Sequence, residues 1–174
     1  RAAHWMLLET AFSSPDTKKG SGLWLTHNEH PLINQAGRAT IKNTRENGIF
    51  VFRANRASDI LQALAFSQKH QLKAIISGGQ EAWVVREALA ASGTPVVINA
   101  LDNLPGSFDG LGARLDNATL LHAAGVTLLF TSGETHNARK LRQVAGNAVA
   151  NGLPYEVAIA AMTSLPAEIF GGKP

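Results

Sequence analysis

The sequence predicts an α/β fold built from consecutive parallel βα units. From Ile49 onward, four short runs of β-branched and other apolar residues alternate with longer stretches of helical periodicity. The four runs are apolar throughout, which is typical of strands buried on both faces of a parallel sheet. They begin at Ile49, Ala74, Pro95 and Val126, a spacing that suits a barrel or a doubly wound sheet. The expected strands are residues 49–52, 74–76, 95–98 and 126–130.

Helical periodicity follows each expected strand. The first of these helices is expected to open at Ser58, a good N-cap residue that places Asp59 in the first turn against the helix dipole. Gly93 has the position of a glycine just beyond a helix end. Pro154 suits the first position of a later helix, which Pro166 is expected to end. The remaining helices are expected at residues 80–91, 115–124 and 137–151, with a long loop over residues 100–114.

The first 48 residues follow a less regular pattern. Residues 2–12 have helical periodicity, and residues 13–21 are rich in helix-breaking types. Arg38, Lys42 and Arg45 lie at helical spacing and indicate a basic stripe on a solvated helix face. We therefore divide the chain into a helical and irregular lead-in, residues 1–48, and a βα-repeat segment, residues 49–174.

Composition excludes several classes of function. The chain has 174 residues, 45% of them hydrophobic and 17% charged, which is typical of a globular chain rather than a disordered one. It has no cysteine, so disulfides, thiolate metal sites and cysteine nucleophiles are excluded. A net charge of +3, spread along the chain, gives no indication of nucleic-acid binding. No run is long and apolar enough for a membrane span, and no leader peptide is expected.

Candidate binding residues are those at the ends of the expected strands. Ligands of barrels and doubly wound sheets gather beyond the carboxyl ends of the strands. The rule selects polar side chains from all four strand ends, and we expect a ligand site there. The selected residues are Arg53, Asn55, Ser77, Asn99, Ser132, Glu134 and His136.

Two of the selected loops have phosphate-binding character. Residues 77–79 and 131–133 place small residues between a strand and a helix, where backbone amides favour an anion. Neither loop contains the lysine of a P-loop, and no dinucleotide-binding fingerprint follows the first strand. Ser132, Glu134 and His136 supply the residue types of a hydrolytic triad without the sharp turn that a nucleophile elbow needs. His27 and His30 share a helical spacing, but Pro31 follows and favours a surface loop.

Five stretches carry a resemblance to a known family. They are FRANRASDILQAL (residues 52–64), ISGGQEAW (76–83), ASGTPVVI (91–98), GVTLLFTSG (125–133) and NGLPYEVAIAAMTSLPAEIFG (151–171). In their order and their amino-acid sequences, they resemble the second half of an amidohydrolase-superfamily barrel, in particular the imidazolonepropionase-like branch. The resemblance implies the second half of a TIM-like (β/α)8 barrel, a metal-dependent hydrolase acting on carbon–nitrogen bonds, and a chain that is a fragment of such a domain.

The positions of the family's metal ligands hold other residues in this chain. Aligned along the matching stretches, Arg53 and Gly78 replace the histidines after the fifth and sixth strands, and Gly133 replaces the aspartate after the eighth. Glycine has no side-chain ligand, and a guanidinium has no acceptor atom for a metal ion. We therefore expect a degenerate, non-catalytic site without a metal.

Two other functions stay open. One is a working hydrolase whose zinc or other divalent metal is held by a missing N-terminal half, with Arg53 or His136 polarising the substrate carbonyl. The other is a domain that binds a phosphorylated small molecule at residues 77–79 and 131–133.

Open sheet edges imply a partner. Four βα units cannot close an eight-stranded barrel, so the outer strands are expected to keep exposed edges. The missing portion of the parent chain or a second copy is expected to cover them. The sequence leaves the compartment open, and the resemblance is compatible with a periplasmic or secreted protein.

Overall fold

The structure is a computed structural model that describes residues 2–13 and 34–171. The chain divides into two compact units, Arg1–Phe50 and Val51–Pro174. The expected loop at residues 13–21 and the pair His27 and His30 lie outside the described residues, apart from Ser13 at the end of the first helix.

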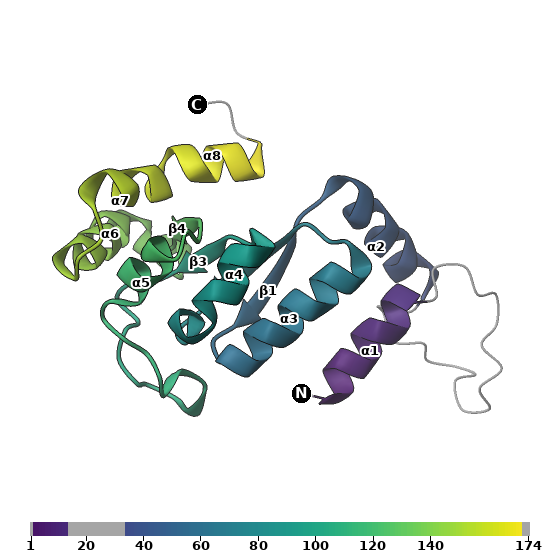
Figure 1. Cartoon of the computed structure of the whole chain (residues 1–174). Helices are drawn as coiled ribbons and strands as arrows, with labels where there is room; N and C mark the ends of the chain where they lie inside the picture. The colour runs from purple at the N-terminus through teal and green to yellow at the C-terminus, as the bar shows by residue number, and fades with distance from the viewer. Residues whose placement is uncertain (1, 14–33, 172–174) are drawn as a thin grey trace. The chain divides into compact units, whose positions relative to one another are not determined.

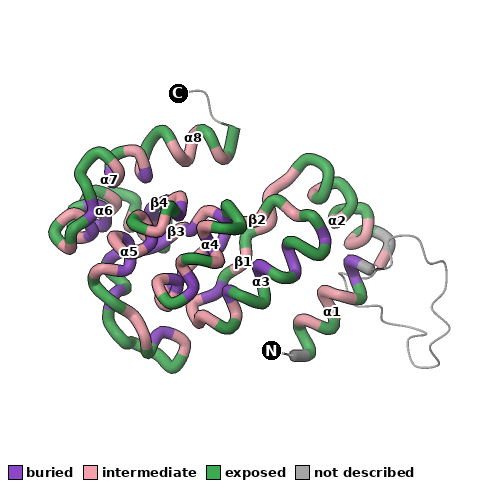
Figure 2. The backbone as a smooth tube through the Cα atoms, viewed as in Figure 1, coloured by how far each residue is buried: buried purple, intermediate pink, exposed green. Residues whose placement is uncertain are grey.

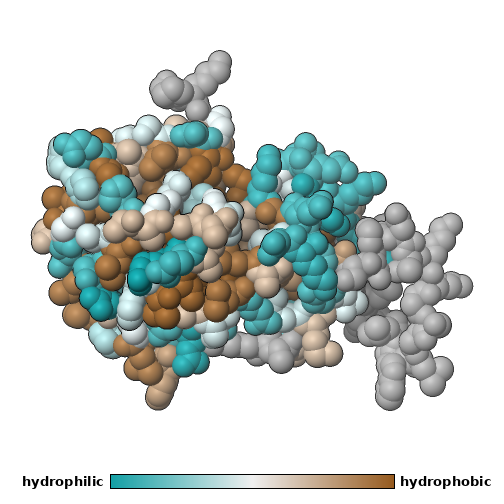
Figure 3. All heavy atoms as spheres, viewed as in Figure 1, coloured by the Kyte–Doolittle hydropathy of each residue, from teal (hydrophilic) through white to brown (hydrophobic). Residues whose placement is uncertain are grey.

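The first unit contains two helices, α1 (Ala2–Ser13) and α2 (Gln35–Asn47), that pack against each other. The Asn34 side chain caps α2 by accepting a hydrogen bond from the Gly37 amide at 2.8 Å. The rings of Phe12 and Phe50 meet edge to face, with their centroids 5.5 Å apart. Both helices expected in this part of the chain are confirmed, and α2 presents the hydrophilic surface seen in teal in Figure 3.

The second unit is built on a four-stranded parallel sheet with the order β1-β2-β3-β4 (Figure 1). The strands are β1 (Phe50–Ala54), β2 (Ala74–Gly78), β3 (Val96–Ile98) and β4 (Leu128–Phe130). The α/β class and the run of consecutive parallel βα units agree with the prediction. The ends differ: β1 and β2 run two residues further than expected, so that Arg53 and Ser77 belong to strands rather than to the loops after them.

Helices alternate with the strands. After β1 comes α3 (Ala57–His70); between β2 and β3 lie the 3₁₀ turn η1 (Ala82–Val85) and α4 (Arg86–Ser92). The connection from β3 to β4 contains η2 (Phe108–Gly110) and α5 (Asn117–Ala123). After β4 come η3 (Thr135–Lys140), α6 (Leu141–Ala150), α7 (Tyr155–Met162) and α8 (Ser164–Phe170). Figure 1 shows α3 and α4 on the same side of the sheet.

Several expected helix boundaries were wrong. The N-cap residue of α3 is Arg56, not Ser58, and the Arg56 side chain makes no capping hydrogen bond. Pro154 is the N-cap residue of α7 rather than its first residue, and it makes no side-chain cap either. Two expected helices open instead with 3₁₀ turns, η1 and η3. Pro166 does not end a helix: the chain breaks earlier, at Thr163, and Pro166 lies in the first turn of α8, where its missing amide proton costs no intrahelical bond.

The core lies between the sheet and its helices. Ile76 in β2, Val96 in β3 and Leu128 in β4 are register partners and are almost completely buried. Figure 2 shows the buried positions in purple along the inner strands and the inward sides of the helices. At the outer strand β1, by contrast, Val51 is 59% exposed and Arg53 is also exposed. Within the described residues, no helix combines the length and apolar character that a membrane crossing needs.

Candidate functional site

A polar cavity of about 240 Å³ lies at the carboxyl ends of the strands. All four strand ends and the β3–α5 loop contribute to its wall. It contains five of the seven residues selected from the sequence. The lining residues are Arg53, Asn55, Ser77, Gly78, Gln80, Ile98, Asn99, Asp102, Asn103, Asn117, Thr131, Gly133 and Glu134.

The other two selected residues, Ser132 and His136, do not line this cavity. The Ser132 hydroxyl donates to the backbone carbonyl of Glu134 at 3.3 Å, which is a local turn contact. His136 is exposed on η3. Among the described residues, no hydrogen bond joins Ser132 to His136, so the loop does not assemble the nucleophile and base of a hydrolytic triad.

The β1 and β2 side of the cavity presents donors. Arg53, Asn55 and Ser77 make no side-chain hydrogen bond or ion pair with any other residue that the structure describes. The Asn55 side chain lies over Gly78, which has a φ of +104° and leaves no room there for a Cβ atom. A guanidinium, an amide and a hydroxyl are therefore available to a ligand on this side.

The β3 side presents a fixed carboxylate. Asn99 Nδ2 donates to Asp102 Oδ2 at 3.0 Å, and Asn99 Oδ1 accepts from the Leu101 amide at 3.2 Å. The Asp102 amide donates to the Asn99 carbonyl at 2.9 Å. Gln80 Nε2 donates to the Asp102 carbonyl at 3.1 Å. Asn99, selected as a ligand-binding residue, thus has both side-chain atoms engaged and holds Asp102 in place.

Two residues that were not selected from the sequence, Asn117 and Glu81, hold the turn after β2 beside the cavity. Asn117 is 3% exposed; its Nδ2 donates to the Gly79 carbonyl at 2.9 Å, and its Oδ1 accepts from the Trp83 amide at 3.2 Å. The Glu81 carboxylate accepts from the amides of Ala57 and Gly112, each at 3.1 Å. These contacts join the β2 turn to the first turn of α3 and to the β3–α5 loop. The only signal for Asn117 and Glu81 in the sequence is a polar side chain beside a turn. Such a signal does not identify the distant backbone group that the side chain contacts.

The β3–α5 loop is further held over Trp83. Trp83 Nε1 donates to the Gly112 carbonyl at 2.7 Å, and the Arg114 guanidinium lies 4.9 Å from the centroid of the Trp83 ring. Arg114 also forms a two-point pair with Asp116, at 2.7 and 2.8 Å. The hydrogen bond from Arg114 lowers the pKa of the Asp116 carboxyl below its ordinary value, and the same bond raises the pKa of Arg114.

The outer part of the same loop is apolar and exposed. Leu104 is 69% exposed and Phe108 is 83% exposed. Figure 3 shows brown surface at the lower edge of the molecule, where Figure 1 places this loop. The loop therefore has a polar, fixed base beside the cavity and an apolar tip away from it.

In and beside the two loops considered for phosphate, several backbone amides already have partners within the chain. The Gly79 amide donates to the Ala54 carbonyl at 2.8 Å, and the Glu81 amide donates to the Asn55 carbonyl at 2.9 Å. The Gly133 amide donates to Thr131 Oγ1 at 3.1 Å. These three amides are satisfied within the chain, whereas the Ser132 amide has no partner among the described residues, so a phosphate site at residues 77–79 or 131–133 stays a prediction.

The donor set does not fit the divalent metal that the fold family implies. Arg53, Gly78 and Gly133, the three positions matched to metal ligands, line the cavity and supply no coordinating atom from their side chains. Within residues 2–13 and 34–171, no three His, Cys, Asp or Glu residues converge as a metal cluster would require. The acidic residues of the cavity, Asp102 and Glu134, come from different strand ends.

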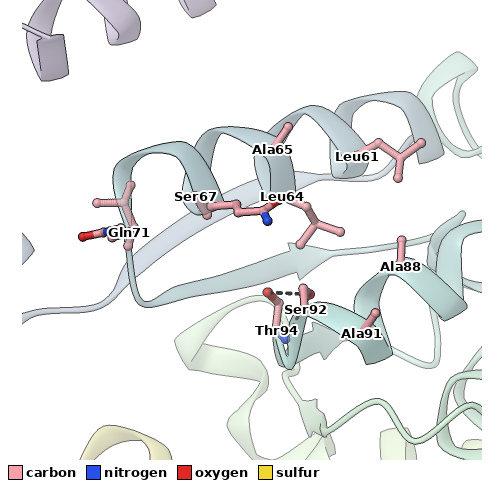
Figure 4. A pocket seen from close by; sticks show the side chains of 11 residues that line it. Leu61, Leu64, Ala65, Ser67, Gln71, Ala88, Ala91, Ser92 and Thr94 are labelled. Carbon is pink, nitrogen blue, oxygen red and sulfur yellow. Dashed lines mark hydrogen bonds between the residues drawn. The ribbon is translucent and has the colours of Figure 1, made fainter.

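A second, larger cavity of about 660 Å³ lies between α3 and α4 (Figure 4). Its walls are largely aliphatic, with Leu61, Leu64, Ala88 and Ala91 among them. The Ser92 hydroxyl and Thr94 Oγ1 are 2.9 Å apart and hydrogen-bonded, as the dashed line in Figure 4 shows. This groove lies between α3 and α4, away from the carboxyl ends of the strands, and none of its lining residues is charged.

Comparison with solved structures identifies the fold. The crystal structure of an amidohydrolase from Thermotoga maritima MSB8 matches with a TM-score of 0.70 and 18% sequence identity, over 98% of this chain and 42% of that chain. The present chain thus has an amidohydrolase-like fold and corresponds to part of a TIM-like barrel. It spans less than half the length of the solved amidohydrolase. No family model and no curated protein sequence matches the chain.

Proposed function

We propose that this chain is a segment of an amidohydrolase-like domain that binds a small polar molecule through its own side chains and does not hold a catalytic metal. The stretches quoted above favour the imidazolonepropionase-like branch as the origin of the segment, and the length of the solved amidohydrolase supports its being a fragment. Catalysis, where it occurs, then belongs to other parts of a parent protein.

The observation that carries this proposal is the chemistry of the polar cavity. A permanent cation, Arg53, occupies a position at which a metal ion would be repelled, while Asn55 and Ser77 present uncharged donors beside it. Such groups bind anionic and polar organic groups well and bind divalent cations poorly. The cavity is open and small, so it suits a metabolite rather than a polymer.

Two measurements on the same sample test the proposal. Elemental analysis of chain purified without chelator is expected to find substoichiometric zinc, manganese and iron. An NMR screen of small polar molecules, run with and without chelator, is expected to shift the same backbone amides around Arg53 and Ser77 in both conditions. One equivalent of metal that survives dialysis against chelator would overturn the proposal and favour the hydrolase alternative. So would the absence of any small molecule that perturbs these amides.

The partner belongs to the same proposal. Val51 is 59% exposed on β1, an outer strand of the sheet. An exposed parallel edge favours pairing with another strand, and we propose that further βα units of a longer chain, or a second copy, cover it. Sedimentation of the chain over a dilution series is expected to show association. A stable, unaggregated monomer at all concentrations would contradict this part.

A further inference from the structure

The charges of the polar cavity are separated along the sheet. Arg53 belongs to β1, whereas Asp102 follows β3 and Glu134 follows β4. Neighbouring strands lie about 4.8 Å apart, so the ends of β1 and β3 are separated by about 10 Å. The cavity therefore has a cationic end and an acidic end with uncharged groups between them.

The two ends do not neutralise each other. No ion pair joins Arg53 to Asp102 or Glu134 in the described part of the chain. Arg53 has all its donors available, and Asp102 is held in position by Asn99 and through its carbonyl by Gln80. A carboxylate fixed by its neighbours loses little freedom when it binds a cation, which favours affinity. Glu134 is exposed and its carboxylate has no partner among the described residues, so it is the weaker member of the acidic end.

The geometry points to a specific chemical class of ligand, and this inference rests on the proposed function. We infer that the cavity binds a linear zwitterion whose anionic group meets Arg53 and Asn55 and whose ammonium group meets Asp102. Both charges of such a molecule would find an opposite, hydrogen-bonding partner. A molecule with two like charges would place one of them beside a group of its own sign.

Three probes of matched length separate this inference from simpler ones. ε-Aminocaproate is a zwitterion with six carbons, adipate is a diacid with six carbons, and hexamethylenediamine is the corresponding diamine. Their affinities for the full chain are measured by NMR titration at low and moderate salt. ε-Aminocaproate is expected to bind at least about tenfold more tightly than either of the other two, because one charge-assisted hydrogen bond is replaced by a repulsion. γ-Aminobutyrate tests the length, and is expected to bind more weakly because it cannot reach both ends.

Charge substitutions assign the two ends. Arg53→Gln is expected to weaken binding of ε-aminocaproate about tenfold, so that ε-aminocaproate no longer binds more tightly than hexamethylenediamine. Asp102→Asn is expected to remove its advantage over adipate. Arg139→Gln and Glu156→Gln are matched controls, since both residues are exposed and neither lines the cavity. They should leave all three affinities unchanged.

The outcomes distinguish the inference from the proposed function. Equal or tighter binding of adipate or hexamethylenediamine at the same amides would overturn the zwitterion inference and leave a polar-molecule site standing. Perturbation of no amides near Arg53 by any probe would overturn the inference and, with a negative screen, the proposed function. If Arg139→Gln or Glu156→Gln also removed the preference for ε-aminocaproate over the other two probes, the preference would reflect nonspecific charge effects. That result would also overturn the inference.

Discussion

The turns that end β2 and follow β4 have similar sequences, Ser77-Gly78-Gly79 and Thr131-Ser132-Gly133, but they differ in what holds them. The β2 turn is joined to three distant segments: Asn117 holds its carbonyl, and Glu81 ties it to α3 and to Gly112. The β4 turn is joined to β3 by one backbone hydrogen bond, from the Thr131 amide to the Ile98 carbonyl at 3.0 Å. The side-chain hydrogen bonds that the structure describes in this turn are local, from the Gly133 amide to Thr131 Oγ1 and from the Ser132 hydroxyl to the Glu134 carbonyl. One side of the cavity is therefore fixed by side chains that contact distant segments, and the other by a backbone hydrogen bond to β3 and by local contacts.

The difference shows how similar sequences acquire different roles. Small residues let the chain turn at both places, but within the described residues only the β2 turn receives a buried polar side chain from elsewhere in the fold, that of Asn117. Substitutions in and around the β2 turn should therefore cost stability. Equivalent substitutions around the β4 turn should cost less stability.

The largest effect is expected for Asn117→Ala. The substitution removes the acceptor of the Trp83 amide and leaves the Gly79 carbonyl with only the Ala82 amide as a donor, and it also removes a buried side chain. We expect a loss of about 3 kcal/mol in the free energy of unfolding. Urea unfolding followed by circular dichroism measures it. Asn137→Ala, in the β4 connection, is the matched control and should change stability by less than about 0.5 kcal/mol. Equal losses in the two variants would remove the contrast between the turns.

A second comparison uses the glycines of the two turns. Gly78→Ala places a Cβ atom against the Asn55 side chain at a φ of +104°, so both strain and overlap oppose it. Gly133 has a φ of +81° and nothing closer than Asn99 Nδ2 at 3.9 Å, so only the strain applies. We expect losses of about 2–3 kcal/mol for Gly78→Ala and about 1 kcal/mol for Gly133→Ala. Thermal unfolding of the two variants side by side would contradict this order if Gly133→Ala proved the more damaging.

The sequence predicted the sheet because its strands are apolar runs, which are largely buried from β2 to β4, although Val51 and Arg53 of β1 are exposed. Ile76 and Val96 belong to such apolar runs, which can be identified in the sequence without knowing which segments they contact. The strand-end rule likewise selected Arg53 and Ser77, because parallel strands place their carboxyl ends at one edge.

What the sequence did not predict depends on distant contacts or fine helix geometry. Glu81 meets an amide 24 positions away, and Asn117 meets a carbonyl 38 positions away, and no local pattern indicates either contact. Ser132 and His136 were selected because they follow β4, but the 3₁₀ turn η3 carries His136 away from the cavity. The periodicity of a short 3₁₀ turn cannot be separated from that of an α-helix over so few residues.

A smaller effect is expected when the carboxylate of Glu81 is neutralised. Glu81→Gln keeps the shape of the side chain but replaces one acceptor oxygen with a donor, so the amide of Ala57 or of Gly112 loses its partner. The favourable charge at the start of α3 is also lost. We expect a loss of about 1 kcal/mol by urea unfolding. Glu134→Gln, the equivalent change in the β4 turn, should leave stability within about 0.5 kcal/mol of the original chain. Comparable losses at both positions would show that the β4 turn is also held by its carboxylate.

The smallest effect concerns the exposed ion pair between Arg114 and Asp116, at the end of the β3–α5 loop. Because Arg114 lowers the pKa of Asp116, the folded chain binds a proton at this carboxyl less readily than the unfolded chain does. The pair therefore stabilises the fold above the ordinary carboxyl pKa of 3.8, and its contribution disappears as the pH falls through the lower folded value. NMR titration of the Asp116 carboxyl should show its pKa rising towards 3.8 in the Arg114→Gln variant. The stability of that variant should differ from that of the original chain only slightly at neutral pH, since solvent screens an exposed pair, and the difference should vanish in acid. An unchanged Asp116 pKa would show that the arginine acts on the turn only through its contact with Trp83.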